Sequence, residues 1–399
     1  MSVPTDVFGF IKAHHLTSAR ADEGGVAVAP AQVLSVYVPS TTDDHTHAYG
    51  WRMQLRHAFA SARNGIDERA VSEREAFEAC VRRIEARLAD AGLVPDESVP
   101  PSFMLRAPGW MALAATDGEL IETRLAVAPD WSATWGEHAV IMPYLVAMRA
   151  DDAVIVLIDH AHATIARLLR GVVHPFETLA IDNAIEVGTH MGDAPRAGFH
   201  TGTRGETATD SAQRQRRNDY EQLIATVQRK LAVIAGATAR IVIGGAPEVA
   251  AHFLATLPGS LATRAVVSEQ LQLHSPFAEI PEAVQAALMD LLTRRQLELL
   301  ATLERRAHLT RNAAFGLENA EAAASAGAIE RLIIAESVWR AYPEDIEALA
   351  QQALRGGADV EVASPACADA LEAHGGVAAE LRFVVPPRVP LDMPGAMPR

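Results

Sequence analysis

The sequence predicts an α/β protein made of three α/β domains. Short apolar stretches alternate with longer stretches of helical periodicity along the whole chain. The length of 399 residues exceeds what one ordinary hydrophobic core holds. Hydrophobic residues make up 49% and charged residues 21%, the balance of a folded protein. We place the three domains at residues 1–150, 151–280 and 281–399.

The first domain opens with Val33–Pro39, where the alternation of side chains is typical of a strand. Two helices are expected next, over about Tyr49–Ala62 and Glu73–Ala91, the second with apolar residues at helical spacing. Strands are then expected at Gly109–Ala115 and Leu120–Leu125. The Asp-Gly pair between them is a strong hairpin signal, so the two strands should be antiparallel neighbours.

The second domain begins with Ala153–Ile158, which is apolar throughout and is therefore expected to be a central strand. A returning strand is expected at Ala163–Leu169. Gly188–Thr209 is rich in Gly, Thr and His without apolar periodicity, which indicates a long loop. The elements expected after it are a helix with one apolar face at Ala212–Ala235, a strand at Ile241–Gly245, a helix at Pro247–Leu257 and a strand fragment at Val266–Val267.

The third domain is expected to start with a helix over about Pro281–His308, whose Leu297, Leu300 and Leu303 face inward. The elements expected after it are a helix at Ala314–Ala326, a strand at Arg331–Ile334, a helix at Ile346–Arg355, a strand at Val360–Val362 and a helix at Ala366–Glu372.

The composition limits the classes of function. The net charge of −15 argues against general binding of polyanions, so any nucleic-acid contact needs a local cluster of basic residues. Cys80 and Cys367 lie far apart, which makes a disulfide framework or a cysteine zinc site unexpected. The start of the chain lacks a signal-peptide pattern, and the longest apolar run, near Ala139–Met148, is too short to span a bilayer. We therefore expect a cytoplasmic protein without a membrane partner.

The best candidate site is the loop His200–Thr209 with the first turns of the helix after it. Its Gly, Thr and Arg content could place a flexible basic finger on RNA, and three arginines follow it. The same residues also fit a surface loop followed by a solvated helix face. The candidate RNA-binding residues are Gly202, Thr203, Arg204, Gly205, Glu206, Arg214, Arg216 and Arg217.

Other polar clusters have ordinary interpretations. Asp43-Asp44-His45-Thr46-His47 contains metal-ligand residue types but lies in an expected loop. Asp159-His160-Ala161-His162 follows a central strand, where ligands gather, but a tight turn capped by Asp159 explains it better. A nuclease would need converging carboxylates, for which Asp159, Asp182 and Glu186 are candidates in a chain rich in acidic residues. Gly244-Gly245 fits a strand-to-helix turn better than a phosphate loop, so we expect no metal and no cofactor.

Several segments resemble the superfamily of class 1 release factors and Pelota. The third domain shows a Gly-hydrophobic-Glu helix start and a closing Gly-Gly-hydrophobic-Ala-Ala-x-Leu-Arg-aromatic stretch, in an order similar to that of a domain like ribosomal protein L7Ae. The opening strand, the strand Ile155–Asp159 and the Gly-Gly turn are similar to the bacterial members, the archaeo-eukaryotic release-factor-like family with its Balon-like proteins. The segments that carry the resemblance are Val33–Pro39, Ile155–Asp159, Ile243–Gly245, Ala314–Ala320, Ala326–Ile334, Gly357–Val362 and Gly375–Phe383.

This resemblance implies a middle domain of RNase H-like fold, a C-terminal L7Ae-like domain, and binding to rRNA in the ribosomal A site in hibernation, stalling or rescue. It also implies a translational GTPase partner such as elongation factor Tu. Where release factors carry Gly-Gly-Gln, this chain has Arg204-Gly205-Glu206, so peptidyl-tRNA hydrolysis is not expected. The first domain has no Asn-Ile-Lys-Ser motif, so stop-codon decoding is not expected either. A metal-dependent RNA nuclease, a peptidyl-tRNA hydrolase with an altered loop, and a plain RNA-binding module remain as alternatives.

Overall fold

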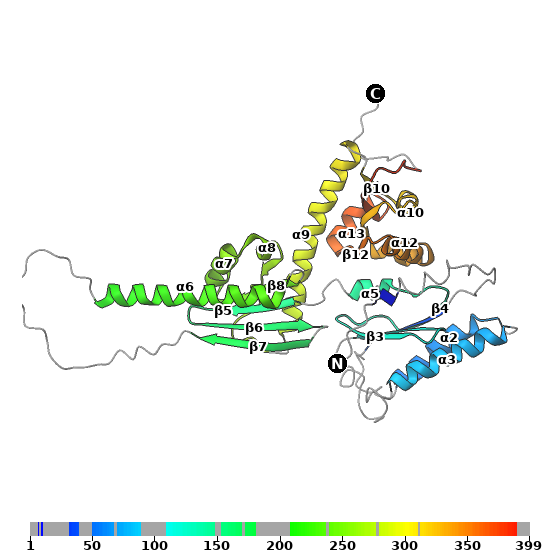
Figure 1. Cartoon of the computed structure of the whole chain (residues 1–399), viewed down its shortest axis with the longest axis horizontal. Helices are drawn as coiled ribbons and strands as arrows, with labels where there is room; N and C mark the ends of the chain where they lie inside the picture. The colour runs from blue at the N-terminus through cyan, green and yellow to red at the C-terminus, as the bar shows by residue number, and fades with distance from the viewer. Residues whose placement is uncertain are drawn as a thin grey trace, which may run out of the picture. The chain divides into compact units, whose positions relative to one another are not determined.

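The computed structural model describes residues 7, 9–10, 32–39, 50–67, 70–88, 109–147, 153–169, 172–180, 208–236, 239–276, 279–309 and 312–388. The chain divides into two compact units. Unit 1 comprises residues 1–151, 170–172 and 289–399, and unit 2 comprises residues 152–169 and 173–288. The described residues form three sheets with helices against them, so the predicted α/β class is confirmed (Figure 1). Each of the three predicted domains contains one sheet, and the exact domain boundaries stay a prediction.

The sheet of unit 2 has five strands in the order β7-β6-β5-β8-β9. Its centre is β5 (Ala153–Ile158), which is buried along its whole length, as predicted. It pairs antiparallel with β6 (His162–Leu169) and parallel with β8 (Arg240–Gly245). The edge strands are β7 (Val172–Ala180) and the short β9 (Ala265–Val267). Because β5 and β8 are parallel, their carboxyl ends meet at one edge of the sheet, with Ile158 opposite Gly245.

One face of this sheet is covered by α6 (Ala208–Ala235) and α7 (Pro247–Thr256). The side chain of Gln228 on α6 donates to the backbone oxygen of Thr256, which ties the two helices together. The 28 residues of α6 span about 42 Å, whereas the six residues of β5 or β8 span only about 20 Å. The helix is therefore too long for the sheet, and its first turns project beyond the strands (Figure 1). A short helix, α8 (Gly259–Ala262), connects α7 to β9.

The N-terminal sheet of unit 1 has the order β3-β2-β1-β4. The predicted hairpin is confirmed, because β2 and β3 pair antiparallel and Gly118 takes the positive φ of 105° that the turn needs. Two helices pack on one face of this sheet, burying Phe77 and Ile84 among others. The elements are β1 (Val33–Pro39), α2 (Gly50–Asn64), α3 (Val71–Leu88), β2 (Gly109–Ala115), β3 (Leu120–Leu125), β4 (Ser132–Gly136) and α5 (Met142–Ala147).

The C-terminal sheet of unit 1 has the order β10-β13-β11-β12, with helices on both faces. One core face holds Leu349 and Leu354 of α12, and the other holds Leu300 and Leu303 of α9. The elements are α9 (Ile280–Leu309), β10 (Ala313–Phe315), α10 (Leu317–Ser325), β11 (Ile329–Ile334), α11 (Glu336–Ala341), α12 (Pro343–Arg355), β12 (Asp359–Val362), α13 (Pro365–Glu372) and β13 (Val377–Leu381).

Two predictions about this sheet are wrong. The expected helix Ala314–Ala326 does not begin at Ala314, because residues 313–315 pair with β13 as strand β10. Gly316, with φ of 79°, separates the strand from α10, which starts at Leu317. Leu297 does not face inward: it is 37% exposed, whereas Leu300 and Leu303 are buried.

Candidate nucleic-acid interface

The predicted site is described only in part. Gly202, Thr203, Arg204, Gly205 and Glu206 lie outside the described residues. Their role as the RNA-binding loop therefore stays a prediction. The three arginines that follow them lie on the projecting first turns of α6.

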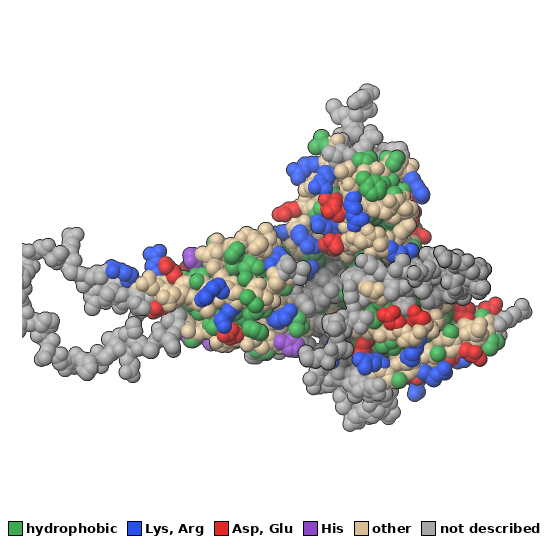
Figure 2. Space-filling model, in the orientation of Figure 1, with side chains coloured by type: hydrophobic (Ala, Val, Ile, Leu, Met, Phe, Trp, Pro, Cys, Tyr) green, Lys and Arg blue, Asp and Glu red, His purple; other side chains and the backbone are tan. Residues whose placement is uncertain are grey.

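The described arginine side chains at this end of α6 are exposed. Arg214 and Arg217 both face solvent, while the side chain of Arg216 is outside the described part of the helix. Arg217 pairs with Glu221 one turn along, with 3.1 Å between guanidinium Nε and carboxylate Oε1, and both side chains are largely exposed. Such a pair contributes at most about 1 kcal/mol, so a phosphate can compete for Arg217 at little cost. Figure 2 shows Lys and Arg side chains on the projecting end of α6, close to acidic ones.

An aromatic cluster that sequence analysis missed lies next to these arginines. The ring of Tyr220 on α6 stacks with that of His252 on α7, with centroids 6.1 Å apart and planes at 28°. The ring of His160, in the turn after β5, contacts that of Tyr220 in a tilted arrangement, with centroids 5.7 Å apart and planes at 51°. Burial raises the pKa of Tyr220, so this hydroxyl stays protonated at neutral pH. The three residues come from three separate elements, and no local motif announces them.

Asp159 acts as a turn cap, as its ordinary interpretation predicted. Its carboxylate accepts the backbone N–H groups of Ala161 and His162 at 2.7 and 2.6 Å. Burial alone would raise the pKa of Asp159, but these two hydrogen bonds and the neighbouring His162 ring together lower it. The other two nuclease candidates, Asp182 and Glu186, and the Asp43–His47 cluster lie outside the described residues. Among the residues that the structure describes, no group of three His, Cys, Asp or Glu could hold a metal ion.

Gly245 makes the strand-to-helix turn that was expected. Its φ of 112° is a conformation that side-chain-bearing residues rarely adopt, and a Cβ at this position would overlap the carbonyl oxygen of Ile158. Its backbone N–H donates to Leu271 at 2.7 Å, so it is not directed at a ligand. The turn therefore fixes the start of α7, and with it the place of His252.

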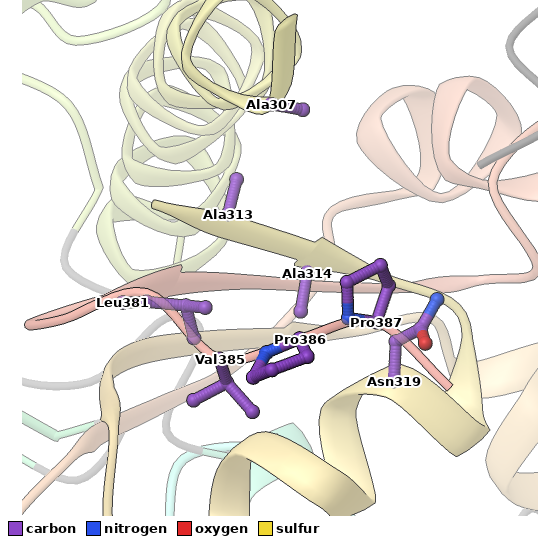
Figure 3. Close-up of a pocket in the computed structure, with 8 residues that line it drawn as sticks. All are labelled: Ala307, Ala313, Ala314, Asn319, Leu381, Val385, Pro386 and Pro387. Atoms are coloured by element: carbon purple, nitrogen blue, oxygen red, sulfur yellow. The ribbon is translucent and has the colours of Figure 1, made fainter. Parts of the chain in front are cut away.

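A separate cavity of about 240 Å³ lies in the C-terminal part of unit 1 (Figure 3). Its walls are mostly aliphatic. The one polar side chain lining it, Asn319, donates its amide to Phe315 and accepts the backbone N–H of Arg388. The amide of Asn319 is therefore hydrogen-bonded to backbone groups on both of its polar atoms. The lining residues are Ala307, Ala313, Ala314, Asn319, Leu381, Val385, Pro386 and Pro387.

The segment with the projecting helix matches a known family. Residues 142–289 match the model of Bacterial archaeo-eukaryotic release factor family 10. The chain is release-factor-like over this segment. The family resemblance predicted from the sequence is thus confirmed where the model matches, which covers α5 and all of unit 2. The exposed arginines of α6 and the cluster around Tyr220 all lie within this release-factor-like segment.

The chain is also similar to several solved structures. Archaeoglobus fulgidus Pelota is 16% identical, with 69% of this chain and 79% of that chain covered and a TM-score of 0.36. An archaeal translation termination factor, aRF1, is 18% identical, with 88% and 92% covered and a TM-score of 0.24. A ribosome-bound archaeal Pelota, described together with ABCE1, is 18% identical, with 69% and 78% covered and a TM-score of 0.40. No curated protein matches the chain.

In the part of the chain that the structure describes, none of the helices combines the length and apolar character needed to cross a membrane.

Proposed function

We propose that this protein is a translation factor that binds rRNA in the ribosomal A site, in hibernation, stalling or rescue. The observation that carries the proposal is the family match over residues 142–289, the segment that contains the projecting helix α6.

The charge distribution supports a local contact. A chain with a net charge of −15 is repelled by RNA over most of its surface, so attraction must come from a small basic region. Arg214 and Arg217 lie at the projecting end of α6, directly after the loop Gly202–Glu206. Binding through a few phosphates should weaken as salt rises, but with a shallow slope.

We propose that binding occurs without peptidyl-tRNA hydrolysis. The loop has Arg204-Gly205-Glu206 where release factors carry Gly-Gly-Gln. Arg204 restricts the backbone at a position where glycine permits positive φ, and Glu206 replaces an amide donor with a negative charge. Misplacing a single water-orienting group costs about a hundredfold or more in rate. Peptide release from stalled ribosomes is therefore expected to be negligible.

The test is co-sedimentation of the purified protein with 70S ribosomes. The double variant Arg214→Glu, Arg217→Glu should lose binding, since it reverses two charges at the projecting end of α6. Arg229→Glu is the matched control, because Arg229 is an exposed arginine on the same helix but lies beyond the projecting turns. Equal binding by the double variant and the control would contradict the α6 contact, and no binding by the wild-type protein would contradict the function.

Peptide release on the same ribosomes tests the loop. The wild-type protein should release no peptide, and the double change Arg204→Gly, Glu206→Gln should restore some release if the loop is presented as in release factors. Efficient release by the wild-type protein would contradict this part of the proposal.

The resemblance of the C-terminal domain to L7Ae-like domains leads us to propose a translational GTPase partner such as elongation factor Tu. Pull-down of that GTPase with the full-length chain, with and without GTP, tests this. The described residues offer no observation that favours the nuclease alternative. The alternative of a plain RNA-binding module makes a different prediction, because such a module would bind naked RNA as tightly as it binds ribosomes.

A further inference from the structure

Three rings form a continuous surface at the carboxyl edge of the unit 2 sheet. Tyr220 lies between His160 and His252, in ring contact with each. The phenol is half-buried, whereas both histidines are exposed. If the cluster served only to fill the core, the outer rings would be covered, as Phe253 beside His252 is. The cluster therefore offers aromatic surface to solvent from a position that is held in place.

Each of the three rings is held in place by a different element of unit 2. His160 sits two residues after the central strand β5, and its turn is held by Asp159. His252 lies on α7, whose start is set by the constrained Gly245. Tyr220 lies 15 residues before the end of α6 at Ala235, which is about 22 Å along the helix and close to the length of a six-residue strand. Tyr220 therefore lies at about the level at which α6 leaves the sheet.

The chemistry around the rings favours one kind of ligand. Base rings stack on aromatic side chains irrespective of their sequence, and an exposed cation nearby can take the adjoining phosphate. Arg217 lies one helical turn from Tyr220 and is held only by its surface pair with Glu221. Three acidic residues lie on the elements that carry the rings: Asp159 in the turn of His160, Glu221 on α6 and Glu248 on α7. Their negative charges would repel a closely spaced run of phosphates. A single unpaired nucleotide fits this surface better than a duplex does.

We propose that His160, Tyr220 and His252 form a stacking platform for an unpaired nucleotide of RNA, with Arg217 taking its phosphate. This inference rests on the proposed ribosome-binding function and adds a second contact, separate from the loop Gly202–Glu206, at the root of the projecting helix. The platform discriminates single-stranded from paired RNA, because a base must leave its stack to lie on the rings.

The experiment measures binding of a fluorescently labelled single-stranded RNA hexanucleotide and of a blunt RNA duplex that contains the same six bases, at low salt. His252→Ala and Tyr220→Leu should each weaken single-strand binding by about fivefold or more and leave duplex binding unchanged. Tyr220→Phe keeps the ring and should bind like the wild-type protein. His274→Ala and Phe176→Ala are matched controls, since both change an exposed ring of unit 2 outside the cluster.

Ultraviolet cross-linking of the same hexanucleotide gives an independent readout. The cross-linked peptides should contain Tyr220 or His252 in the wild-type protein. Unchanged single-strand binding by His252→Ala and Tyr220→Leu, equal losses on both RNAs, or no binding of the hexanucleotide by the wild-type protein would each overturn the platform. Ribosome co-sedimentation of these variants distinguishes failure of the platform from failure of the proposed function. If the variants still sediment with ribosomes and bind the hexanucleotide like the wild-type protein, the platform is wrong and the ribosome-binding function still stands.

Discussion

Glu347 on α12 accepts hydrogen bonds from the start of α5 in unit 1. Substituting Glu347 tests how much this contact between the two helices contributes to the stability of the unit. Its two carboxylate oxygens accept the backbone N–H groups of Ile141 and Met142, each at 2.9 Å. Ile141 and Met142 are 1% and 0% exposed, so water cannot easily replace the carboxylate. Gln351, one turn along the same helix, donates to the backbone oxygen of Ala139 at 2.6 Å.

Glu347→Ala should therefore destabilise unit 1. A buried donor that loses its acceptor costs about 1–3 kcal/mol, so the loss of two acceptors predicts a drop of about 2–6 kcal/mol. Glu347→Gln keeps one acceptor oxygen but places an amide NH₂ against the second N–H, and should cost about half as much. Glu344→Gln is the matched control: Glu344 is an exposed glutamate on the same helix, and its change should stay within about 0.5 kcal/mol.

The same contact predicts a dependence on pH. Burial raises the pKa of Glu347 from 4.5 to about 7, against the lowering effect of the two N–H donors. A carboxyl with a raised pKa in the folded state contributes stability at low pH that is lost as the pH rises through about 7. The full shift corresponds to about 3 kcal/mol, and partial exposure of the half-buried side chain reduces this to about 1–2 kcal/mol. The stability of the wild-type protein relative to Glu347→Gln should therefore fall between pH 5 and pH 8.

Amide hydrogen exchange of peptides covering residues 138–147 measures the effect where it acts, since the lost acceptors belong to Ile141 and Met142. Protection of these peptides should drop in Glu347→Ala and stay unchanged in Glu344→Gln. Comparing wild type with Glu347→Gln at each pH cancels the intrinsic pH dependence of exchange. Unchanged protection in Glu347→Ala, or a relative stability that rises with pH, would refute the reasoning.

Three further changes test the fold around the candidate interface and the C-terminal core, each by thermal unfolding. Gly245→Ala forces a positive φ on alanine and a clash with backbone, and should cost at least about 2 kcal/mol, whereas Gly259→Ala, with open space at its Cβ, should be nearly neutral. Arg264→Lys should cost about 1 kcal/mol, because a lysine cannot reach the three backbone oxygens that the guanidinium holds after α6 and at α8. Leu303→Ala should cost about 2–5 kcal/mol, and Leu297→Ala less than about 1 kcal/mol, in line with their burial. Equal effects within either matched pair, or an Arg264→Lys variant as stable as wild type, would contradict the corresponding assignment.

The elements that could be predicted from the sequence are those whose own residues indicate both their type and their burial. Ala153–Ile158 is apolar at every position, which only a strand covered on both faces can accommodate, and it is the centre of its sheet. The strand β7 (Val172–Ala180) was not predicted, and it contains Pro175, a residue that argues against a central strand. Its place at the sheet edge removes that objection. For residues 313–315 the pairing with β13, far along the chain, overrode the helix-favouring alanines.

The candidate interface was predictable only where it is local in sequence. The basic residues of α6 follow one another along the helix, so their grouping could be read directly. Tyr220 and the two histidines come together only because β5 and β8 are parallel and place a turn and a helix start at the same edge. That register depends on pairing between residues almost ninety positions apart, such as Ile158 and Gly245, and no short pattern encodes it.

The start of α6 shows how a helix that is packed along part of its length can extend beyond the sheet that supports it. The first residues of this helix have no apolar periodicity, and the sequence accordingly predicted a start near Ala212, whereas the helix begins at Ala208. An isolated helix of this composition and a few turns would be marginal in water, because nucleation is costly. Here Leu223, Val227 and Leu231 fix the helix on the sheet, and each further residue toward Ala208 adds a hydrogen bond to a helix that already exists. The packed part of α6 thus supports further helical turns beyond the edge of the sheet.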